Sequence, residues 1–513
     1  MFYSDTFNRL RLPLAFAAGA LAPLSFSPLN LWPLALLALA LLYFLLDNTT
    51  PKRAALTSWC FGFGFFGIGA SWVYVSIHDY GNAPPLLAGF LTLLFVAGLA
   101  TLFALQGWGF RKFGAARYPV AGFAATWLLG EWLRSWLLTG FPWLYLGYAH
   151  VTTLFAGLAP LFGVFGISFV LALSSALLVE GWRQFQYRDR SKPPLHQALR
   201  GWQQSLCLLV LWTLSALSGR VNWVTPVLEG TLDVALVQAN IPQELKFADD
   251  ALENNFRTQM ELSEPLWNHD LVVWSETALP LVYATDSPLL NEVAAVVNGH
   301  DSTLLTGIFA RTDAGLHNSL AVLGNGSGLW HKQKLVPFGE YTPLRGLLGP
   351  MLELFALPMS SLVPGPARQE LLTAAGSVRI APFICYEVVY PEFVRRYAQN
   401  ADLLVTVSND TWFGASWGPP QHLQMAAMRA LENGRYMVRA TNNGISALID
   451  ERGHIVARAP QFEAATLSGT VQLFTGHTPW SRWGNWPLLV LCWLLLLANF
   501  YQIRSPSLTT GKS

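Results

Sequence analysis

The sequence reads Val-Arg-Ile-Ala-Pro-Phe-Ile-Cys from position 378 to position 385. A short, mostly apolar run of this kind indicates a buried β-strand. Cys385 closes the run at the strand-to-turn position from which many enzymes present a reactive group. It is also the only one of the four cysteines that lies outside a long apolar segment. This position favours a nucleophile and leaves open an inert thiol, so the neighbouring residues must decide.

Similar short runs recur between residues 222 and 482, where they alternate with amphipathic stretches. The predicted strands are 233–238, 271–274, 302–307, 378–385 and 401–407, and the predicted helices include 249–262 and 421–432. Alternation of β-branched strands with helices is typical of one α/β domain whose sheet is largely buried. The sequence therefore predicts an α/β domain in this region.

The rest of the chain is strongly apolar. The whole sequence of 513 residues is 52% hydrophobic and 12% charged, which is about half the charged fraction of an ordinary soluble protein. Each apolar stretch is near the ~20 residues that a membrane-spanning helix needs. The predicted spans are 12–29, 31–46, 55–77, 85–108, 118–138, 152–180, 202–218 and 486–501. We therefore predict a polytopic α-helical membrane bundle with about eight transmembrane helices.

The positive charges predict the orientation of this bundle. Lysines and arginines gather before the first span and after the second, fourth, sixth and eighth, which places these connections on the cytoplasmic side. Both termini would then be cytoplasmic, and the α/β domain would face the periplasm of a bacterium. The first apolar run is followed at once by another span, so we expect an anchor and not a removed signal peptide. The predicted domains are 1–220 for seven helices of the bundle, 221–483 for the periplasmic domain, and 484–513 for the last helix and tail.

Composition also excludes several kinds of site. A net charge of +1 gives no concentrated basic surface, so nucleic acid is not an expected partner. The four cysteines form no close pair, and the ten histidines show no metal-ligand spacing. We predict no metal, no cofactor and no disulfide.

Three strand ends of the α/β domain carry complementary groups. Glu276 follows the strand at 271–274, Lys332 and Lys334 with Glu340 lie on a loop after another strand, and Cys385 ends a third. A nearby base and a nearby cation would generate and stabilise a thiolate from a thiol whose ordinary pKa is ~8.5. A lysine beside the reacting carbon would also offset an oxyanion, which is worth about 3 kcal/mol or more. The pattern predicts acyl transfer.

The strings that hold these residues resemble the nitrilase superfamily, whose domains are αββα sandwiches. They are LVVWSETALP (271–280), KLVPFGEYTP (334–343) and FICYEVVYPE (383–392). Further strings resemble the membrane branch of that superfamily, the apolipoprotein N-acyltransferases, over nearly the whole chain. They are GFGFFGIGASWVYVSI (62–77), LTGFPWLYLGY (138–148), LPMSSL (357–362), VSNDTWFG (407–414), QHLQMAAMRALE (421–432) and TNNGISALI (441–449).

The resemblance implies a Glu-Lys-Cys triad of Glu276, Lys332 and Cys385. Cys385 would take a fatty acyl chain from a phospholipid as a thioester and pass it to the α-amine of the N-terminal diacylglyceryl-cysteine of an apolipoprotein. Glu276 would move the protons, and Lys332 would hold the oxyanion with a backbone N–H after the cysteine. The family commonly has histidine where this chain has Lys334, so two lysines compete, and we assign the role to Lys332.

Five further residues are candidate supporting or substrate-binding residues. Glu340 would orient Lys332 or steer the amine, against the alternative of a solvated loop carboxylate. Glu387 would support the active-site loop or cap a helix that begins near Pro391. Tyr386 adjoins the cysteine, and Trp412 and Trp223 would line the lipid entrance or belong to an interfacial belt of the 21 tryptophans. Residues 357–362 are predicted to form a mobile apolar lid.

Two other functions compete with acyl transfer. A transporter with a regulatory nitrilase-like domain predicts charged residues within the spans or inverted repeats, and neither is evident. A membrane-tethered nitrilase-type amidase would use the same triad. A small polar substrate gains nothing from a membrane-facing site, however, whereas a phospholipid and a lipidated protein both arrive in the bilayer.

Overall fold

The computed structural model describes residues 5–188, 195–246, 251–343 and 361–504. The chain divides into two compact units, each treated separately below. One unit contains residues 1–71, 89–221 and 483–513, and the other contains residues 72–88 and 222–482. The sequence had placed residues 72–88 with the membrane bundle, whereas they cluster with the α/β unit. The reason is a set of long-range contacts: the Ser76 Oγ atom donates to the main-chain oxygen of Trp412 at 2.7 Å, and Trp72 meets Phe413 edge to face.

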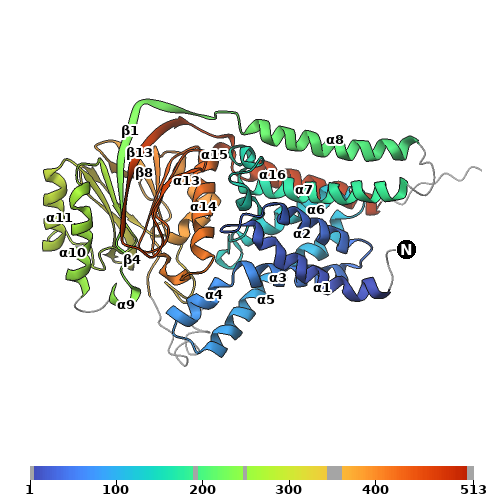
Figure 1. The fold of residues 1–513 in the computed structure, drawn as a ribbon, viewed down its shortest axis with the longest axis horizontal. Helices are drawn as coiled ribbons and strands as arrows, with labels where there is room; N and C mark the ends of the chain where they lie inside the picture. The colour runs from blue at the N-terminus through green and yellow to red at the C-terminus, as the bar shows by residue number, and fades with distance from the viewer. Residues whose placement is uncertain (1–4, 189–194, 247–250, 344–360, 505–513) are drawn as a thin grey trace, which may run out of the picture. The chain divides into compact units, whose positions relative to one another are not determined.

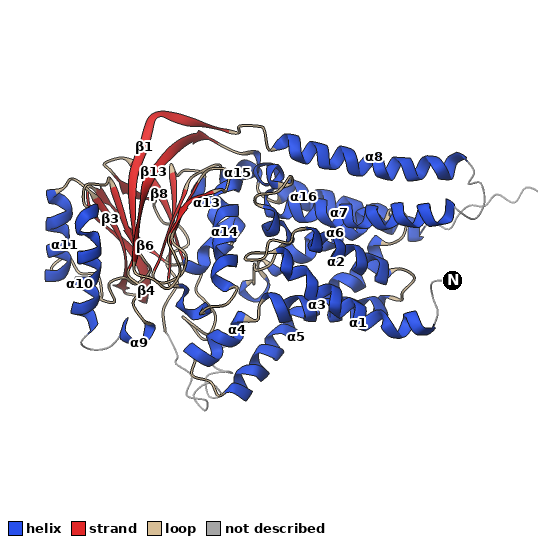
Figure 2. Cartoon of the chain, viewed as in Figure 1, coloured by secondary structure: helices blue, strands red, loops and turns tan. Residues whose placement is uncertain are grey.

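The α/β unit contains two sheets, drawn in red in Figure 2. The first has the order β13-β1-β2-β3-β4-β6, with parallel pairing of β1, β2 and β3 and antiparallel pairing elsewhere. Its strands are β1 (Val224–Gln238), β2 (Leu271–Trp274), β3 (Thr303–Thr312), β4 (Gly315–Gly324), β6 (Leu329–His331) and β13 (Ala465–Gly476). Every residue of β2 is buried, as expected for a parallel strand covered on both faces.

The second sheet has the order β12-β11-β10-β9-β8-β7-β5. Its centre is parallel, because β9 pairs in parallel with both β8 and β10. Its strands are β5 (Gly326–Ser327), β7 (Leu372–Ala374), β8 (Val378–Ile384), β9 (Leu403–Ser408), β10 (Met437–Thr441), β11 (Ala447–Ile449) and β12 (Ile455–Arg458). The run quoted first above is therefore a strand, as predicted, and it lies beside the fully buried β9.

Helices cover the outer faces of both sheets (Figure 1). On the first sheet lie α10 (Ala251–Ser263) and α11 (Pro288–Gly299), whose Phe256, Leu290 and Val293 join a buried core with Trp274. The helices α13 (Pro391–Ala398) and α14 (Gly418–Asn433) lie on the second sheet. The predicted αββα sandwich is confirmed. Shorter elements connect the layers: α9 (Gln243–Lys246), η7 (Glu264–Leu266), η8 (Cys385–Val389) and η9 (Asp410–Phe413), and residues 72–88 add α4 (Trp72–Val75) and η2 (Ser76–Tyr80).

The other unit is helical. Its long helices are α1 (Asp5–Leu21), α2 (Pro33–Leu46), α3 (Pro51–Gly69), α5 (Pro85–Gly109), α6 (Pro119–Arg134), α7 (Ala159–Arg188), α8 (Leu195–Ser218) and α16 (Trp486–Arg504). Among the described residues, two helical segments, Pro85–Gly114 and Ala156–Gln186, are long and apolar enough to cross a membrane, and the bent pair Pro51–Gly69 and Trp72–Tyr80 could add a third. Pro33–Leu46, Gln203–Ser218 and Trp486–Tyr501 are shorter apolar helices. The count of eight spans therefore stays a prediction.

Candidate active site

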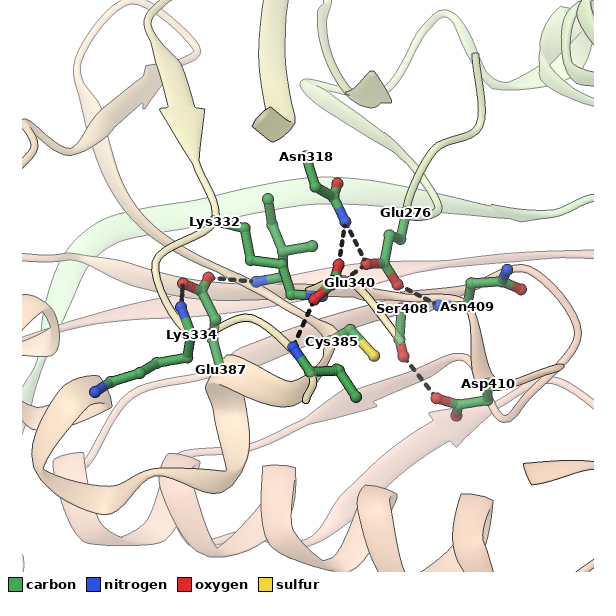
Figure 3. A network of polar contacts seen from close by, with 12 residues as sticks. Glu276, Asn318, Lys332, Lys334, Glu340, Cys385, Glu387, Ser408, Asn409 and Asp410 are labelled. Atoms are coloured by element: carbon green, nitrogen blue, oxygen red, sulfur yellow. Dashed lines mark hydrogen bonds and ion pairs between the residues drawn. The ribbon is translucent and has the colours of Figure 1, made fainter. Parts of the chain in front are cut away.

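Segments that follow three strands bring the candidate residues together (Figure 3). Glu276 lies just after β2, Lys332 directly follows β6, and Cys385 directly follows β8. The strands belong to different sheets, so the group assembles only when the two sheets stack. The sequence predicted these three residues. In the structure Lys332 donates to Glu276, and the charges of both act on the pKa of the Cys385 thiol.

Lys332 lies between two carboxylates. Its Nζ atom donates to Glu276 Oε1 at 3.0 Å and to Glu340 Oε1 at 2.8 Å. Asn318, on β4, joins the same carboxylates, because its Nδ2 atom donates to Glu276 Oε1 at 2.7 Å and to Glu340 Oε1 at 3.1 Å. Lys332 is 1% exposed and Glu276 is 6% exposed, so the cluster is shielded from water. Glu340 is thus a partner of the lysine and not a solvated loop carboxylate.

Each charged group of this cluster stabilises the charged form of its partner. Burial alone would raise the pKa of Glu276, but the charge of Lys332 and the hydrogen bonds from Lys332 and Asn318 lower it below its usual value. Burial would lower the pKa of Lys332, but Glu276 and Glu340 raise it well above its usual value. At neutral pH the pair is therefore a carboxylate and an ammonium, which suits a base and an oxyanion partner.

Cys385 is partly buried and has a φ of 53°, a conformation that non-glycine residues rarely adopt. Burial raises the pKa of its thiol, and the charge of Glu276 raises it further, while Lys332 and a hydrogen bond with Ser408 oppose these effects. The sequence suggested a stabilised thiolate. The structure instead favours a resting thiol, whose proton leaves as the sulfur attacks.

This protonation state predicts how Cys385 reacts with a simple alkylating reagent. We expect its alkylation by iodoacetamide to keep accelerating from about pH 6 to about pH 9, because only the thiolate reacts and its fraction rises throughout that range. Peptide mass mapping distinguishes Cys385 from the other cysteines. A rate that levels off below neutral pH would mean that Lys332 already holds a thiolate at rest.

Glu387 supports the loop that carries Lys332. Its Oε1 atom accepts hydrogen bonds from the backbone N–H groups of Gln333 at 2.6 Å and Lys334 at 3.2 Å. Its Oε2 atom accepts from the backbone N–H of Ile384 at 2.8 Å and from Trp330 Nε1 at 3.4 Å. Burial raises the pKa of Glu387 to about 7, and these backbone donors oppose that rise. Of the two predicted roles, loop support fits the structure, because these four donors all lie outside α13.

The remaining predicted residues differ in where they lie relative to the cluster of Glu276, Lys332 and Cys385. Lys334 is exposed and its Nζ atom lies 5.2 Å from the Tyr390 ring centroid, so it does not share the buried position of Lys332. Trp412 lies on η9, shortly after the end of β9, and Tyr386 directly follows Cys385. Trp223 precedes the 15-residue strand β1 at its amino end, whereas Glu276 follows the carboxyl end of the parallel strand β2. The structure therefore separates Trp223 from the cluster. Residues 357–360 of the predicted lid lie outside the described residues.

Sequence reasoning missed several residues that hold Glu276. Asn318 bridges the two carboxylates, and the backbone N–H of Asn409 donates to Glu276 Oε2 at 2.8 Å. Lys246 is buried, and its Nζ atom donates to the main-chain oxygen of Glu276 at 2.8 Å. Gly307 leaves room for the backbone next to Glu276, because a Cβ there would lie 2.2 Å from the backbone nitrogen of Thr277. Of these, only the string around Asn409 had been singled out.

The chain is similar to known proteins over most of its length. Residues 18–177 match the family model described as apolipoprotein N-acyltransferase N-terminal domain, and residues 233–476 match the carbon-nitrogen hydrolase model. A protein of Azotobacter vinelandii named apolipoprotein N-acyltransferase is 48% identical over 494 residues, which are 94% of this chain and 93% of that protein. One of the same name from Pseudomonas aeruginosa is 46% identical over 94% of each chain. The chain belongs to the apolipoprotein N-acyltransferase family.

The resemblance read from the sequence is thereby confirmed. In this member of the apolipoprotein N-acyltransferase family, Glu276, Lys332 and Cys385 all lie within the carbon-nitrogen hydrolase match. A solved CN-hydrolase superfamily protein from Xanthomonas campestris is also similar, with 19% sequence identity and a TM-score of 0.36 over 51% of this chain and 96% of that chain. Among the described residues, no group of three or more His, Cys, Asp or Glu side chains is arranged to hold a metal ion.

Proposed function

We propose that this chain is an N-acyltransferase that moves a fatty acyl chain from a phospholipid to the α-amine of the N-terminal diacylglyceryl-cysteine of apolipoproteins. The chain passes through a thioester on Cys385, so the two substrates react in turn. One observation carries the proposal: the buried Lys332 is held by two carboxylates beside the thiol, in a chain whose relatives are named apolipoprotein N-acyltransferase.

In the first half-reaction, the sulfur of Cys385 attacks the ester carbonyl carbon while Glu276 takes the thiol proton. The C–S bond forms and the carbonyl oxygen becomes an oxyanion, which the ammonium of Lys332 stabilises. When the oxyanion collapses, the ester C–O bond breaks and Glu276 returns its proton to the departing lysophospholipid oxygen. The acyl chain remains on Cys385 as a thioester.

In the second half-reaction, the α-amine of the diacylglyceryl-cysteine attacks the thioester carbon. Glu276 takes a proton from the amine as the C–N bond forms, and Lys332 again offsets the oxyanion. The C–S bond then breaks, and the proton on Glu276 returns to the sulfur of Cys385. The free enzyme is restored without a cofactor, and the product carries a third acyl chain.

The other predicted residues support this chemistry in our proposal. Glu340 holds Lys332 in place, and Glu387 shapes the loop that carries it. Tyr386 and Trp412 remain candidates for substrate contact beside Cys385. The distribution of lysine and arginine supports a location in the bacterial inner membrane, with the catalytic unit in the periplasm and both termini in the cytoplasm. Both substrates are membrane lipids or lipidated proteins, which fits the apolar helices.

The proposal is tested by intact-mass measurement of detergent-solubilised protein incubated with defined phospholipids. We expect a mass increase of one acyl chain that hydroxylamine removes, because hydroxylamine cleaves thioesters. Cys385→Ser should lack this hydroxylamine-labile increase, and Cys207→Ser, which changes an exposed cysteine of the helical unit, should retain it. Wild-type protein that stays unmodified with every phospholipid tested would refute the proposal.

A further inference from the structure

A buried polar network adjoins Cys385, and the proposed mechanism does not use it. Asp410 Oδ1 accepts a hydrogen bond from Ser408 Oγ at 2.6 Å and lies 3.0 Å from His422 Nδ1, while Asp410 Oδ2 accepts from Arg439 Nη2 at 2.6 Å. Ser408, Asp410, His422 and Arg439 are each at most 1% exposed. Polar groups this deeply buried are costly unless they are paired, so the network holds one defined arrangement.

The network reaches the main chain of the candidate nucleophile. His422 Nε2 lies 3.2 Å from the carbonyl oxygen of Cys385. A carbonyl oxygen can only accept, so Nε2 carries a hydrogen and donates it. The other ring nitrogen, Nδ1, faces Asp410 and lies 3.1 Å from Arg439 Nη2. Both edges of the imidazole are therefore held, and α14 delivers a fixed donor to the Cys385 carbonyl.

The hydrogen bond to the Cys385 carbonyl lies at a strained turn of the backbone. With a φ of 53°, Cys385 turns sharply between β8 and η8, and a non-glycine residue held there costs on the order of 1–3 kcal/mol. The peptide that joins Cys385 to Tyr386 is planar, so its C=O and N–H point in opposite directions. Fixing the carbonyl therefore fixes the direction of the Tyr386 N–H, directly beside the sulfur-bearing residue.

We propose that His422 is a positioning residue that holds the Cys385 peptide in the orientation required for acyl transfer. It acts through its Nε2–H bond to the Cys385 carbonyl, while Arg439 donates to the Nδ1 atom and orients the imidazole. Asp410 in turn accepts hydrogen bonds from Arg439 and Ser408, so one carboxylate fixes the network. The inference rests on the proposed acyl transfer, because it assigns His422 a part in that reaction.

The test compares three substitutions at one position. Glutamine can place an N–H near the position of Nε2, asparagine can reach only the position of Nδ1, and alanine reaches neither. We expect His422→Ala and His422→Asn to form the acyl-enzyme about tenfold to a hundredfold more slowly, because a misplacement of about 1 Å at the reacting atoms can cost about 10²-fold. We expect His422→Gln to stay within about threefold of wild type, because its hydrogen bond replaces the lost one. KM for the phospholipid should change little, since His422 is buried.

Three further measurements separate positioning from folding. Thermal unfolding is recorded for every variant, and iodoacetamide alkylation of Cys385 should be nearly unchanged, because a small reagent needs no oriented peptide. His269→Ala is the matched control, since its Nδ1 atom contacts the carbonyl oxygen of Leu266 at 2.9 Å near the amino end of β2. It should acylate at the wild-type rate.

Each outcome is decisive. The inference is overturned if His422→Gln is as slow as His422→Asn, or if both react as fast as wild type. It is also overturned if acylation and alkylation fall together with a large loss of thermal stability, because that pattern indicates a purely structural residue. Wild-type protein that forms no acyl-enzyme would refute the proposed function instead, so the two failures are distinguishable.

Discussion

Replacing Glu276 by glutamine is expected to slow acyl-enzyme formation by about 10²–10⁴-fold, the range that a positioned general acid–base contributes. The amide has the shape of the carboxylate but cannot take the proton of Cys385 or return one to the lysophospholipid. Hydrogen bonds from Lys332, Asn318 and the backbone of Asn409 hold the carboxylate in the wild-type protein. The rate is measured as intact-mass increase with time after phospholipid is added.

Alkylation of the same variant should change in the opposite direction. The charge of Glu276 raises the pKa of the Cys385 thiol, so glutamine should lower that pKa and speed the reaction with iodoacetamide at neutral pH. Slower acylation with faster alkylation is difficult to explain by misfolding. Glu340→Gln, which changes the other carboxylate on Lys332, serves as the comparison and should slow acylation less. Normal acylation of Glu276→Gln would assign the base to another residue.

Replacing Lys332 by methionine is expected to lower the rate of acyl-enzyme formation by about 10²–10³-fold, which is the usual cost of one oxyanion donor. The substitution also leaves the buried Glu276 and the partly buried Glu340 without their cation. Removing one partner of a buried pair typically destabilises a protein by about 3–5 kcal/mol. Acylation is followed by intact mass, and stability by thermal unfolding. Lys334→Met is the matched control, because that lysine is exposed and lies away from the carboxylates.

The loss of stability in Lys332→Met should depend on pH in a predictable direction. In the wild-type protein Lys332 lowers the pKa of Glu276, so this contribution is present above the ordinary carboxyl pKa and is lost as pH falls. Without the lysine, burial raises that pKa, and the deficit should shrink on acidification as the carboxylate binds a proton. Adding Glu340→Gln should recover stability but not activity. A double variant that regains both would show that Lys332 is only structural.

Local patterns predicted much of this molecule. The five predicted strands and the two helical segments of the α/β region are all present, because buried runs and amphipathic stretches carry their own periodicity. The short strands β5, β6, β7 and β11 contain only two or three residues each, too few for a periodic signal. The grouping of residues 72–88 with the α/β unit was also missed, because it depends on contacts with η9, which lies far along the chain.

By itself, the sequence determined an α/β domain and a strongly apolar remainder of the chain. It also offered Glu276, Cys385 and two lysines as candidates, because strand ends and their polar residues are adjacent along the chain. Only the tertiary structure decided which lysine is buried between carboxylates, since Lys332 and Lys334 differ in environment and not in chemistry. It also brought Asn318 and His422 to the cluster from distant segments. Burial then set the protonation states, because pKa values depend on desolvation and on charges that meet only when the two sheets stack.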